Sequence, residues 1–271
     1  MAVARLSLRR RSVAMSIGGA AFLVVLQLLF RAPSAEAASS FVFTNACQYP
    51  VWVGSLHGAT SPPLTPSGFF LPPSGKFQLA APSSGTWSGN FWARTGCAVD
   101  AATGRFSCAT ADCGSGAVTC DGRGPAPPVS LAEITLAAPG SGAPDFYDVS
   151  LVDGFNVPVR IAPASGGGGA GDCRPAACAG DVNAMCPSDL RVVSGNNGGV
   201  VACRSACSAY GSPRYCCTGE YGTPATCGPT NYSQVFKTAC PTAYSYAYDD
   251  ASSTFTCTGA SSYDITFCPA T

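Results

Sequence analysis

The most informative stretch of this chain is Gly104-Arg105-Phe106-Ser107-Cys108-Ala109-Thr110-Ala111-Asp112-Cys113, which is followed by Cys120. Together with Cys97 it places four cysteines within 24 residues, and a second dense stretch, from Cys173 to Cys227, holds eight cysteines in 55 residues. Neither stretch has the regularly spaced apolar residues that it would need to form a hydrophobic core of its own. We therefore expect covalent cross-links to hold both stretches together as insertions on a larger domain.

The chain of 271 residues contains sixteen cysteines, and all of them lie between Cys47 and Cys268. An even number at this density predicts eight disulfides, which persist in oxidising compartments. Zinc is the rival interpretation, but no Cys-x-x-Cys pair occurs and His57 is the only histidine, so we expect no metal. The chain also lacks a phosphate loop and a Gly-x-Ser-x-Gly elbow, and we expect no cofactor.

The first 37 residues have the features of a secretory signal peptide. Four arginines precede an uncharged, mainly apolar stretch, Val13–Phe30, and Ala35-Glu36-Ala37 forms a small-x-small cleavage site. A retained membrane anchor is the alternative, because a stretch of about 18 residues approaches the length of a membrane span. The cysteines favour secretion, so we expect residues 1–37 to be a cleaved signal. The chain ends three residues after Cys268 without an apolar tail, and we expect no lipid anchor.

Removal of the signal changes the charge balance. It takes away five arginines and one glutamate, so 15 basic and 15 acidic residues become 10 and 14, a net charge of about −4. Nucleic acid is an unsuitable partner, because phosphate binding requires clustered Lys and Arg. Neutral sugars, or ligands with some positive charge, suit the mature chain better.

Short β-branched and aromatic runs, separated by Gly and Pro, predict an all-β sandwich or barrel. The first two runs, Phe41–Asn45 and Val51–Val53, are expected to form an antiparallel pair around a turn. A helix is expected around Leu190 and from Asn197 to Ala209. Further strands are expected at Phe77–Ala80, Phe91–Ala93, Leu131–Leu136, Phe146–Val152, Val157–Ile161 and Asp264–Phe267.

On the stretch Gly104–Cys113 and the following Cys120, the mature chain is identified as a member of the thaumatin-like, plant pathogenesis-related family. The opening stretch resembles the family signature Gly-x-(Gly/Phe)-x-Cys-x-Thr-(Gly/Ala)-Asp-Cys. Other blocks that agree with the family are Phe91–Cys97, Leu131–Glu133, Asp145–Pro158, Tyr215–Cys217, Cys227–Thr230 and Cys240–Tyr246. The resemblance implies a sandwich of about eleven strands with two smaller disulfide-rich lobes. The expected sandwich core comprises residues 38–94, 129–179 and 241–271, the small lobe 95–128, and the larger lobe, with short helices, 180–240.

Spacing alone leaves the disulfide connectivity open. The family resemblance implies one pairing: Cys47–Cys268, Cys97–Cys108, Cys113–Cys120, Cys173–Cys257, Cys178–Cys240, Cys186–Cys203, Cys207–Cys216 and Cys217–Cys227.

The resemblance also implies an acidic cleft between the sandwich and the larger lobe. Four acids match the family's cleft carboxylates: Glu133, Asp148, Asp153 and Asp249. The cleft arginine of the family is replaced here by Asn90. Gathered carboxylates repel one another, so some of their pKa values should rise, and two carboxyl groups with separated pKa values are what glycosidic cleavage needs. A glycosidase would use Glu133 as general acid and Asp153 as base or nucleophile. The alternative is that these acids only bind sugar hydroxyls or satisfy loop backbone.

Three functions remain open at this stage. The first is a secreted, apoplastic or cell-wall defence protein that is antifungal. Its expected partner is β-1,3-glucan or a related polysaccharide, bound in the acidic cleft, or the surface of a pathogen. The second is a weak endo-β-1,3-glucanase, and the third is a structural or enzyme-inhibitory protein without a glycan ligand. We expect a monomer. Asn231-Tyr232-Ser233 is an N-glycosylation sequon whose occupancy the sequence leaves open, and Tyr248, beside Asp249, is a further candidate for ligand contact.

Overall fold

The computed structural model describes residues 40–165, 173–195 and 198–270. The expected signal segment, residues 1–37, lies outside the described residues. Eleven strands form two sheets, one of five strands and one of six, and this confirms the predicted all-β sandwich. No helix in the described part of the chain is long and apolar enough to span a membrane.

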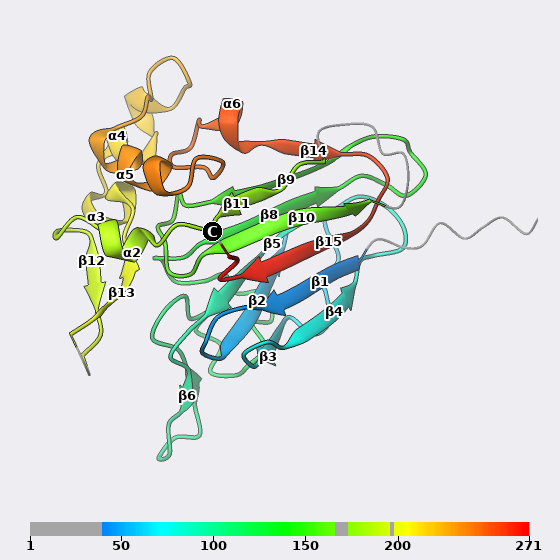
Figure 1. Cartoon of the computed structure of the whole chain (residues 1–271), viewed down its shortest axis with the longest axis horizontal. Helices are drawn as coiled ribbons and strands as arrows, with labels where there is room; N and C mark the ends of the chain where they lie inside the picture. Colours follow the sequence, from blue (N-terminus) through cyan, green and yellow to red (C-terminus); the bar gives the residue numbers. More distant parts are fainter. Residues whose placement is uncertain (1–39, 166–172, 196–197, 271) are drawn as a thin grey trace, which may run out of the picture. The chain divides into compact units, whose positions relative to one another are not determined.

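The five-stranded sheet has the order β11-β10-β15-β1-β4 (Figure 1). Strand β1 pairs with β15 in parallel and with β4 antiparallel. The bounds of its strands are β1 Ser40–Asn45, β4 Lys76–Ala80, β10 Val159–Ser165, β11 Ala176–Cys178 and β15 Ala260–Phe267.

The six-stranded sheet is antiparallel throughout and has the order β14-β9-β8-β5-β2-β3. Its strands are β2 Val51–His57, β3 Gly68–Leu71, β5 Trp87–Arg94, β8 Leu131–Leu136, β9 Asp145–Ser150 and β14 Phe255–Cys257.

Aromatic side chains from the two sheets meet in the core. The ring of Phe41 on β1 lies 5.1 Å from that of Trp87 and 4.7 Å from that of Phe91, both on β5. Phe43, two residues along β1, packs against Phe91 at 5.1 Å. Because side chains alternate across a strand, these positions place the inner face of each sheet in the core and leave the other face free to carry polar groups.

The predicted pairing of the first two strands is wrong, because β1 and β2 belong to different sheets. The segment between them crosses the sandwich and is fixed by Asn45. The side-chain Nδ2 of Asn45 donates hydrogen bonds to the carbonyls of Tyr49 and Leu71. Its side-chain Oδ1 accepts a hydrogen bond from the backbone N–H of Cys47. Cys47 is also bonded to Cys268. A short connection therefore joins two sheets rather than two paired strands.

Two cysteine-rich segments extend from the sheets. Residues 95–128 contain a small antiparallel pair, β6 (Ala98–Val99) with β7 (Phe106–Ser107). Residues 180–240 contain a second pair, β12 (Arg191–Val193) with β13 (Val200–Cys203), and most of the helical turns. The helices are α2 Val182–Met185, α3 Ala206–Tyr210, α4 Pro213–Cys216, η1 Gly219–Tyr221 and α5 Asn231–Ala239, with α6 Asp250–Ser253 following later in the chain.

The prediction of a helix from Asn197 to Ala209 is largely wrong. Two β-branched residues, Val200 and Val201, lie instead in strand β13. Helix α3 starts only after Ser205, whose side chain caps it by accepting a hydrogen bond from the Ser208 amide. It ends at Gly211, whose φ of 63° is left-handed and stops the helix.

The structure contains eight disulfides and no free cysteine among the described residues. They join the same pairs that the family resemblance implies: Cys47–Cys268, Cys97–Cys108, Cys113–Cys120, Cys173–Cys257, Cys178–Cys240, Cys186–Cys203, Cys207–Cys216 and Cys217–Cys227.

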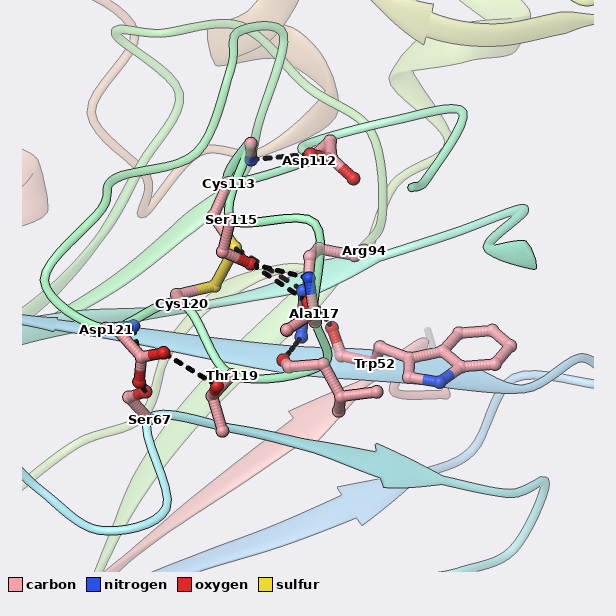
Figure 2. The surroundings of a disulfide bond; sticks show 12 residues. Trp52, Ser67, Arg94, Asp112, Cys113, Ser115, Ala117, Thr119, Cys120 and Asp121 are labelled. Atoms are coloured by element: carbon pink, nitrogen blue, oxygen red, sulfur yellow. Dashed lines mark hydrogen bonds between the residues drawn. A yellow bond between two sulfur atoms is a disulfide. The ribbon is translucent and has the colours of Figure 1, made fainter. Parts of the chain in front are cut away.

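A buried arginine ties the 95–128 segment to the six-stranded sheet (Figure 2). Arg94, at the end of β5, donates to the carbonyls of Trp52 and Val53 on β2 and to that of Val118. Its Nη1 also lies 3.4 Å from the Cys113 sulfur. Burial lowers the pKa of Arg94 to about 10, and the charge of Asp112 partly offsets that effect. The guanidinium thus joins two strands and the disulfide-held segment in one network.

Candidate functional site

Polar side chains from three neighbouring strands form one row on the outer face of the six-stranded sheet. The register places Asn90 on β5 opposite Glu133 on β8, and Glu133 opposite Asp148 on β9. Directly opposed residues lie on the same face with Cβ atoms about 5 Å apart. The residues that follow in sequence, Ile134 and Val149, point into the core. We call Asn90, Glu133 and Asp148 the polar row.

The two carboxyl groups of the polar row lie side by side on neighbouring strands. The side chain of Glu133 is hydrogen-bonded to those of Asn90 and Asp148. Burial raises the pKa of Glu133, and burial together with the charge of Glu133 raises the pKa of Asp148 to about 8. At neutral pH the pair therefore shares a proton, which Asp148 holds and donates toward Glu133.

Two oxygens of the polar row have no hydrogen-bond donor among the described residues. They are Oδ1 of Asn90 and Oδ1 of Asp148, and both atoms are buried. A buried acceptor without a donor costs free energy, which a hydroxyl group supplied by a ligand would recover.

Asp153 lies in the turn after β9, where backbone contacts fix its position, and it is not among the residues that line the groove over the polar row. Its carbonyl accepts a hydrogen bond of 3.2 Å from the Val129 amide. Gly154, which follows, has a φ of 99°, and a Cβ atom there would come 2.6 Å from the carbonyl oxygen of Cys203. The charge of Asp153 contributes to the raised pKa of Glu133, and loss of hydration raises the pKa of Asp153 itself. Its side chain is nevertheless exposed and available to a ligand.

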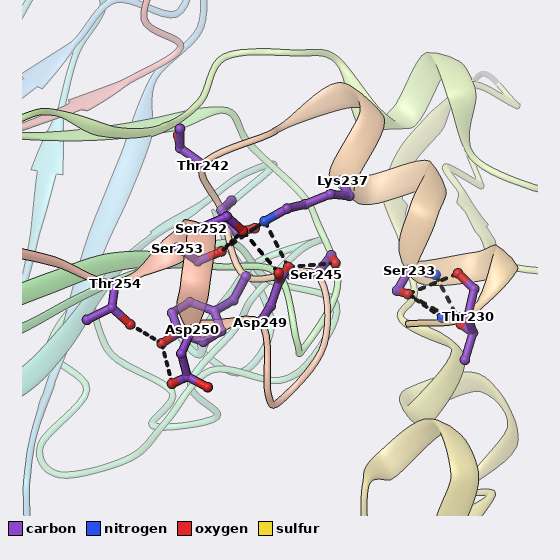
Figure 3. A network of polar contacts seen from close by, with 12 residues as sticks. Thr230, Ser233, Lys237, Thr242, Ser245, Asp249, Asp250, Ser252, Ser253 and Thr254 are labelled. Atoms are coloured by element: carbon purple, nitrogen blue, oxygen red, sulfur yellow. Dashed lines mark hydrogen bonds and ion pairs between the residues drawn. The ribbon is translucent and has the colours of Figure 1, made fainter. Parts of the chain in front are cut away.

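Asp249 is engaged inside the protein rather than directed at a ligand (Figure 3). Its Oδ2 lies 2.9 Å from Lys237 Nζ on α5 and accepts hydrogen bonds from the amide and hydroxyl of Ser245. Its Oδ1 accepts a bond of 3.1 Å from the Ser252 hydroxyl. This carboxylate connects α5 to the start of α6, so it stabilises the fold.

The neighbouring acid, Asp250, is the one whose charge raises the pKa of Asp148. It also accepts a hydrogen bond of 2.9 Å from the Tyr244 hydroxyl. The sequence does not distinguish this residue from Asp249, since two adjacent aspartates give no indication of which one faces the polar row. Tyr248 is likewise engaged, because its hydroxyl donates to the carbonyl of Gly222 at 2.7 Å.

A groove of about 290 Å³ lies over the polar row. It continues along the strands to Ser88, Thr135 and Phe146, and none of the described residues that line it is Lys or Arg. We call it the sheet groove. A second cavity, between Val152 and the 180–240 segment, has a volume of only about 20 Å³ and holds no more than a water molecule. Of the expected cleft residues, the sheet groove therefore contains Asn90, Glu133 and Asp148.

A model of the thaumatin family matches residues 45–269. The chain belongs to the thaumatin family. It is 51% identical over 248 residues to Thaumatin-like protein 1 of Pyrus pyrifolia, covering 91% of this chain and 98% of that protein. It is 54% identical to a Glucan endo-1,3-beta-glucosidase of Prunus avium, covering 86% of this chain and 91% of that protein. Pathogenesis-related protein 5 of Arabidopsis thaliana is also 54% identical, over 87% of this chain and 92% of that protein.

One position of this thaumatin-family groove departs from the pattern described above, namely Asn90 where an arginine is expected. The register shows what the change does, since residue 90 lies directly opposite Glu133. A guanidinium there would favour ionised carboxylates, whereas the amide of Asn90 can only donate a neutral hydrogen bond. The substitution therefore favours the shared proton.

The sequon residue Asn231 is exposed at the first position of α5. The hydroxyl of Ser233 is engaged in the capping box of that helix with Thr230. N-glycosylation at Asn231 stays a prediction.

Proposed function

We propose that this thaumatin-family protein is a secreted plant defence protein that binds β-1,3-glucan in the sheet groove and is antifungal through that binding. The observation that carries the proposal is the groove of about 290 Å³ whose floor is the polar row. Secretion is supported by the eight disulfides, which form in oxidising compartments. A role in defence is supported by relatives named pathogenesis-related proteins.

The chemistry of the groove suits a neutral polysaccharide. Sugar hydroxyls can donate hydrogen bonds to the buried oxygens of Asn90 and Asp148 and accept them from a protonated carboxyl. A negatively charged polymer would meet the charges of Asp153 and Asp250, and the described residues of the groove include no lysine or arginine to compensate. Uncharged hexose units avoid that repulsion.

Weak endo-β-1,3-glucanase activity is a second candidate, and the raised pKa of Glu133 favours it. In this role Glu133 would take over the proton that it shares with Asp148 and donate it to the leaving glycosidic oxygen, while Asp153, exposed in the turn after β9, would act as base or nucleophile. The Prunus avium relative carries the name of such an enzyme.

Binding to insoluble β-1,3-glucan, measured with and without release of reducing sugar, tests both candidates. We expect the wild-type protein to be retained by β-1,3-glucan and Glu133→Gln to be retained less. Glu220→Gln is the matched control, because Glu220 is an exposed glutamate on η1 outside the groove.

The outcomes separate the alternatives. Sugar release by the wild type that is lost in Glu133→Gln and in Asp153→Asn would support catalysis, whereas binding without release supports a binding protein. If the wild-type protein does not bind β-1,3-glucan, the proposal fails and a structural or enzyme-inhibitory role takes its place.

A further inference from the structure

Phe146 is a large apolar side chain that the sheet exposes at the sheet groove. It lies on β9 between two paired strands, opposite Thr135 on β8 and Thr256 on β14, and 47% of its surface is exposed. Single exposed aromatic residues are common on proteins and need no explanation by themselves. Phe146 differs from such cases because it lines a groove together with hydroxyl side chains.

The register arranges these side chains as a second row beside the polar row. Ser88 on β5 lies opposite Thr135, and Thr135 lies opposite Phe146. Each member is two residues along its strand from the corresponding member of the polar row, a step of about 6.7 Å. All three line the same groove as Asn90, Glu133 and Asp148.

We propose that Ser88, Thr135 and Phe146 form a separate subsite for one uncharged hexose unit, next to the unit bound over the polar row. The ring of Phe146 would pack against the apolar C–H face of the sugar, and the hydroxyls of Ser88 and Thr135 would bind its hydroxyl groups. This inference rests on the proposed function, because it assumes that the sheet groove binds a polysaccharide.

Two features determine the class of ligand and its direction. The second row carries no charge, so an unsubstituted sugar suits it better than an acidic or amino sugar. The two rows follow one another along the strands, so the polysaccharide lies along β8 and β9 rather than across the sheet. A ligand must therefore be long enough to cover both rows to gain the contact with Phe146.

The test compares soluble β-1,3-glucan oligosaccharides of two lengths by titration calorimetry. We expect the wild-type protein to bind the longer oligosaccharide more tightly than the shorter one. Phe146→Ala should weaken binding of the longer one roughly three- to tenfold and leave the shorter one unchanged, because one aromatic contact is lost. Phe146→Tyr keeps the ring, so it should bind the longer oligosaccharide more tightly than the shorter one, as the wild-type protein does.

The matched control is Phe70→Ala, since Phe70 is 52% exposed on the edge strand β3 and does not line the groove. Equal weakening by Phe70→Ala and Phe146→Ala would overturn the subsite, as would unchanged binding of the longer oligosaccharide by Phe146→Ala. In the second case, loss of binding in Glu133→Gln would leave the proposed function intact. If the wild-type protein binds neither oligosaccharide, both proposals fail.

Discussion

Asn90 places a neutral side chain at the position where the family resemblance implies an arginine. It lies opposite Glu133, and the two carboxyl groups of the polar row share a proton in a groove whose described residues include no lysine or arginine. Introducing Asn90→Arg should lower the pKa of Asp148 from about 8 by roughly 1 to 3 units, because an adjacent cation favours the ionised carboxylate. Carbon-13 NMR titration of the side-chain carboxyl groups measures this directly. Asn90→Gln, which adds no charge, is the control, and an equal pKa in both variants would contradict the argument.

The shared proton also makes the stability of the fold depend on pH. The pKa of Asp148 is about 8 in the folded chain, whereas the ordinary value for an aspartate, which applies in the unfolded chain, is 3.8. The folded state therefore binds the proton more tightly. The free energy of unfolding must therefore fall as the pH rises from about 4 to about 8. Asp148→Asn cannot ionise, so its stability should fall less over that range, and calorimetric Tm values at a series of pH values measure the difference. Equal slopes for the variant and the wild type would show that Asp148 is ionised in the folded protein.

At the scale of single elements, one ion pair connects α5 to α6. Lys237 on α5 contacts the Asp249 carboxylate at 2.9 Å and donates to the Ala243 carbonyl and the Ser253 hydroxyl. Lys237→Met should reduce the free energy of unfolding by on the order of 2 kcal/mol, because it leaves Asp249 without its charged partner. Lys76→Met is the control, since Lys76 is exposed on β4 and its replacement should change stability by less than about 0.5 kcal/mol. Guanidinium unfolding with intact disulfides measures both, and equal effects would contradict a structural role for the pair.

The elements also show which features the sequence could predict. Alternating apolar residues such as Phe41 and Phe43 predicted the strands, because one face of each strand must enter the core. The partner of each strand was not predictable in the same way. A short connection after Asn45 has the same composition whether it turns back within a sheet or crosses to the other sheet. Only the contacts of the Asn45 side chain with distant carbonyls distinguish the two.

The residues of the candidate site were likewise predictable only in part. Glu133 and Asp148 were predicted from motifs, and the register brings them together. The roles of Asp249 and Asp250 depend on how the backbone turns into α6, which is set by contacts with Lys237 and Tyr244. No local pattern contains that information, and none indicated that Phe146 would stay exposed on a paired strand.

At the scale of the whole molecule, the disulfides differ in how much of the unfolded chain they restrict. Cys47–Cys268 joins residues 221 positions apart and links the end of β1 to the end of β15, whereas Cys113–Cys120 closes a separation of 7 within one segment. In the chain-entropy model the first contributes about 5 kcal/mol and the second about 2.5 kcal/mol. Other cross-links inside the long loop shorten it, but the dependence on length is logarithmic, so the order is preserved.

Replacing both cysteines of each pair by alanine tests this order. The Cys47→Ala, Cys268→Ala protein should lose about twice as much free energy of unfolding as the Cys113→Ala, Cys120→Ala protein, measured by guanidinium unfolding without reductant. The two pairs also differ in their native-state contacts, because the buried Arg94 guanidinium donates to the Cys113 sulfur at 3.4 Å, whereas the Cys268 sulfur lies 3.7 Å from the exposed Tyr49 hydroxyl. If the shorter pair proves the more costly to remove, the network around Arg94, rather than chain entropy, determines what the disulfides contribute to this fold.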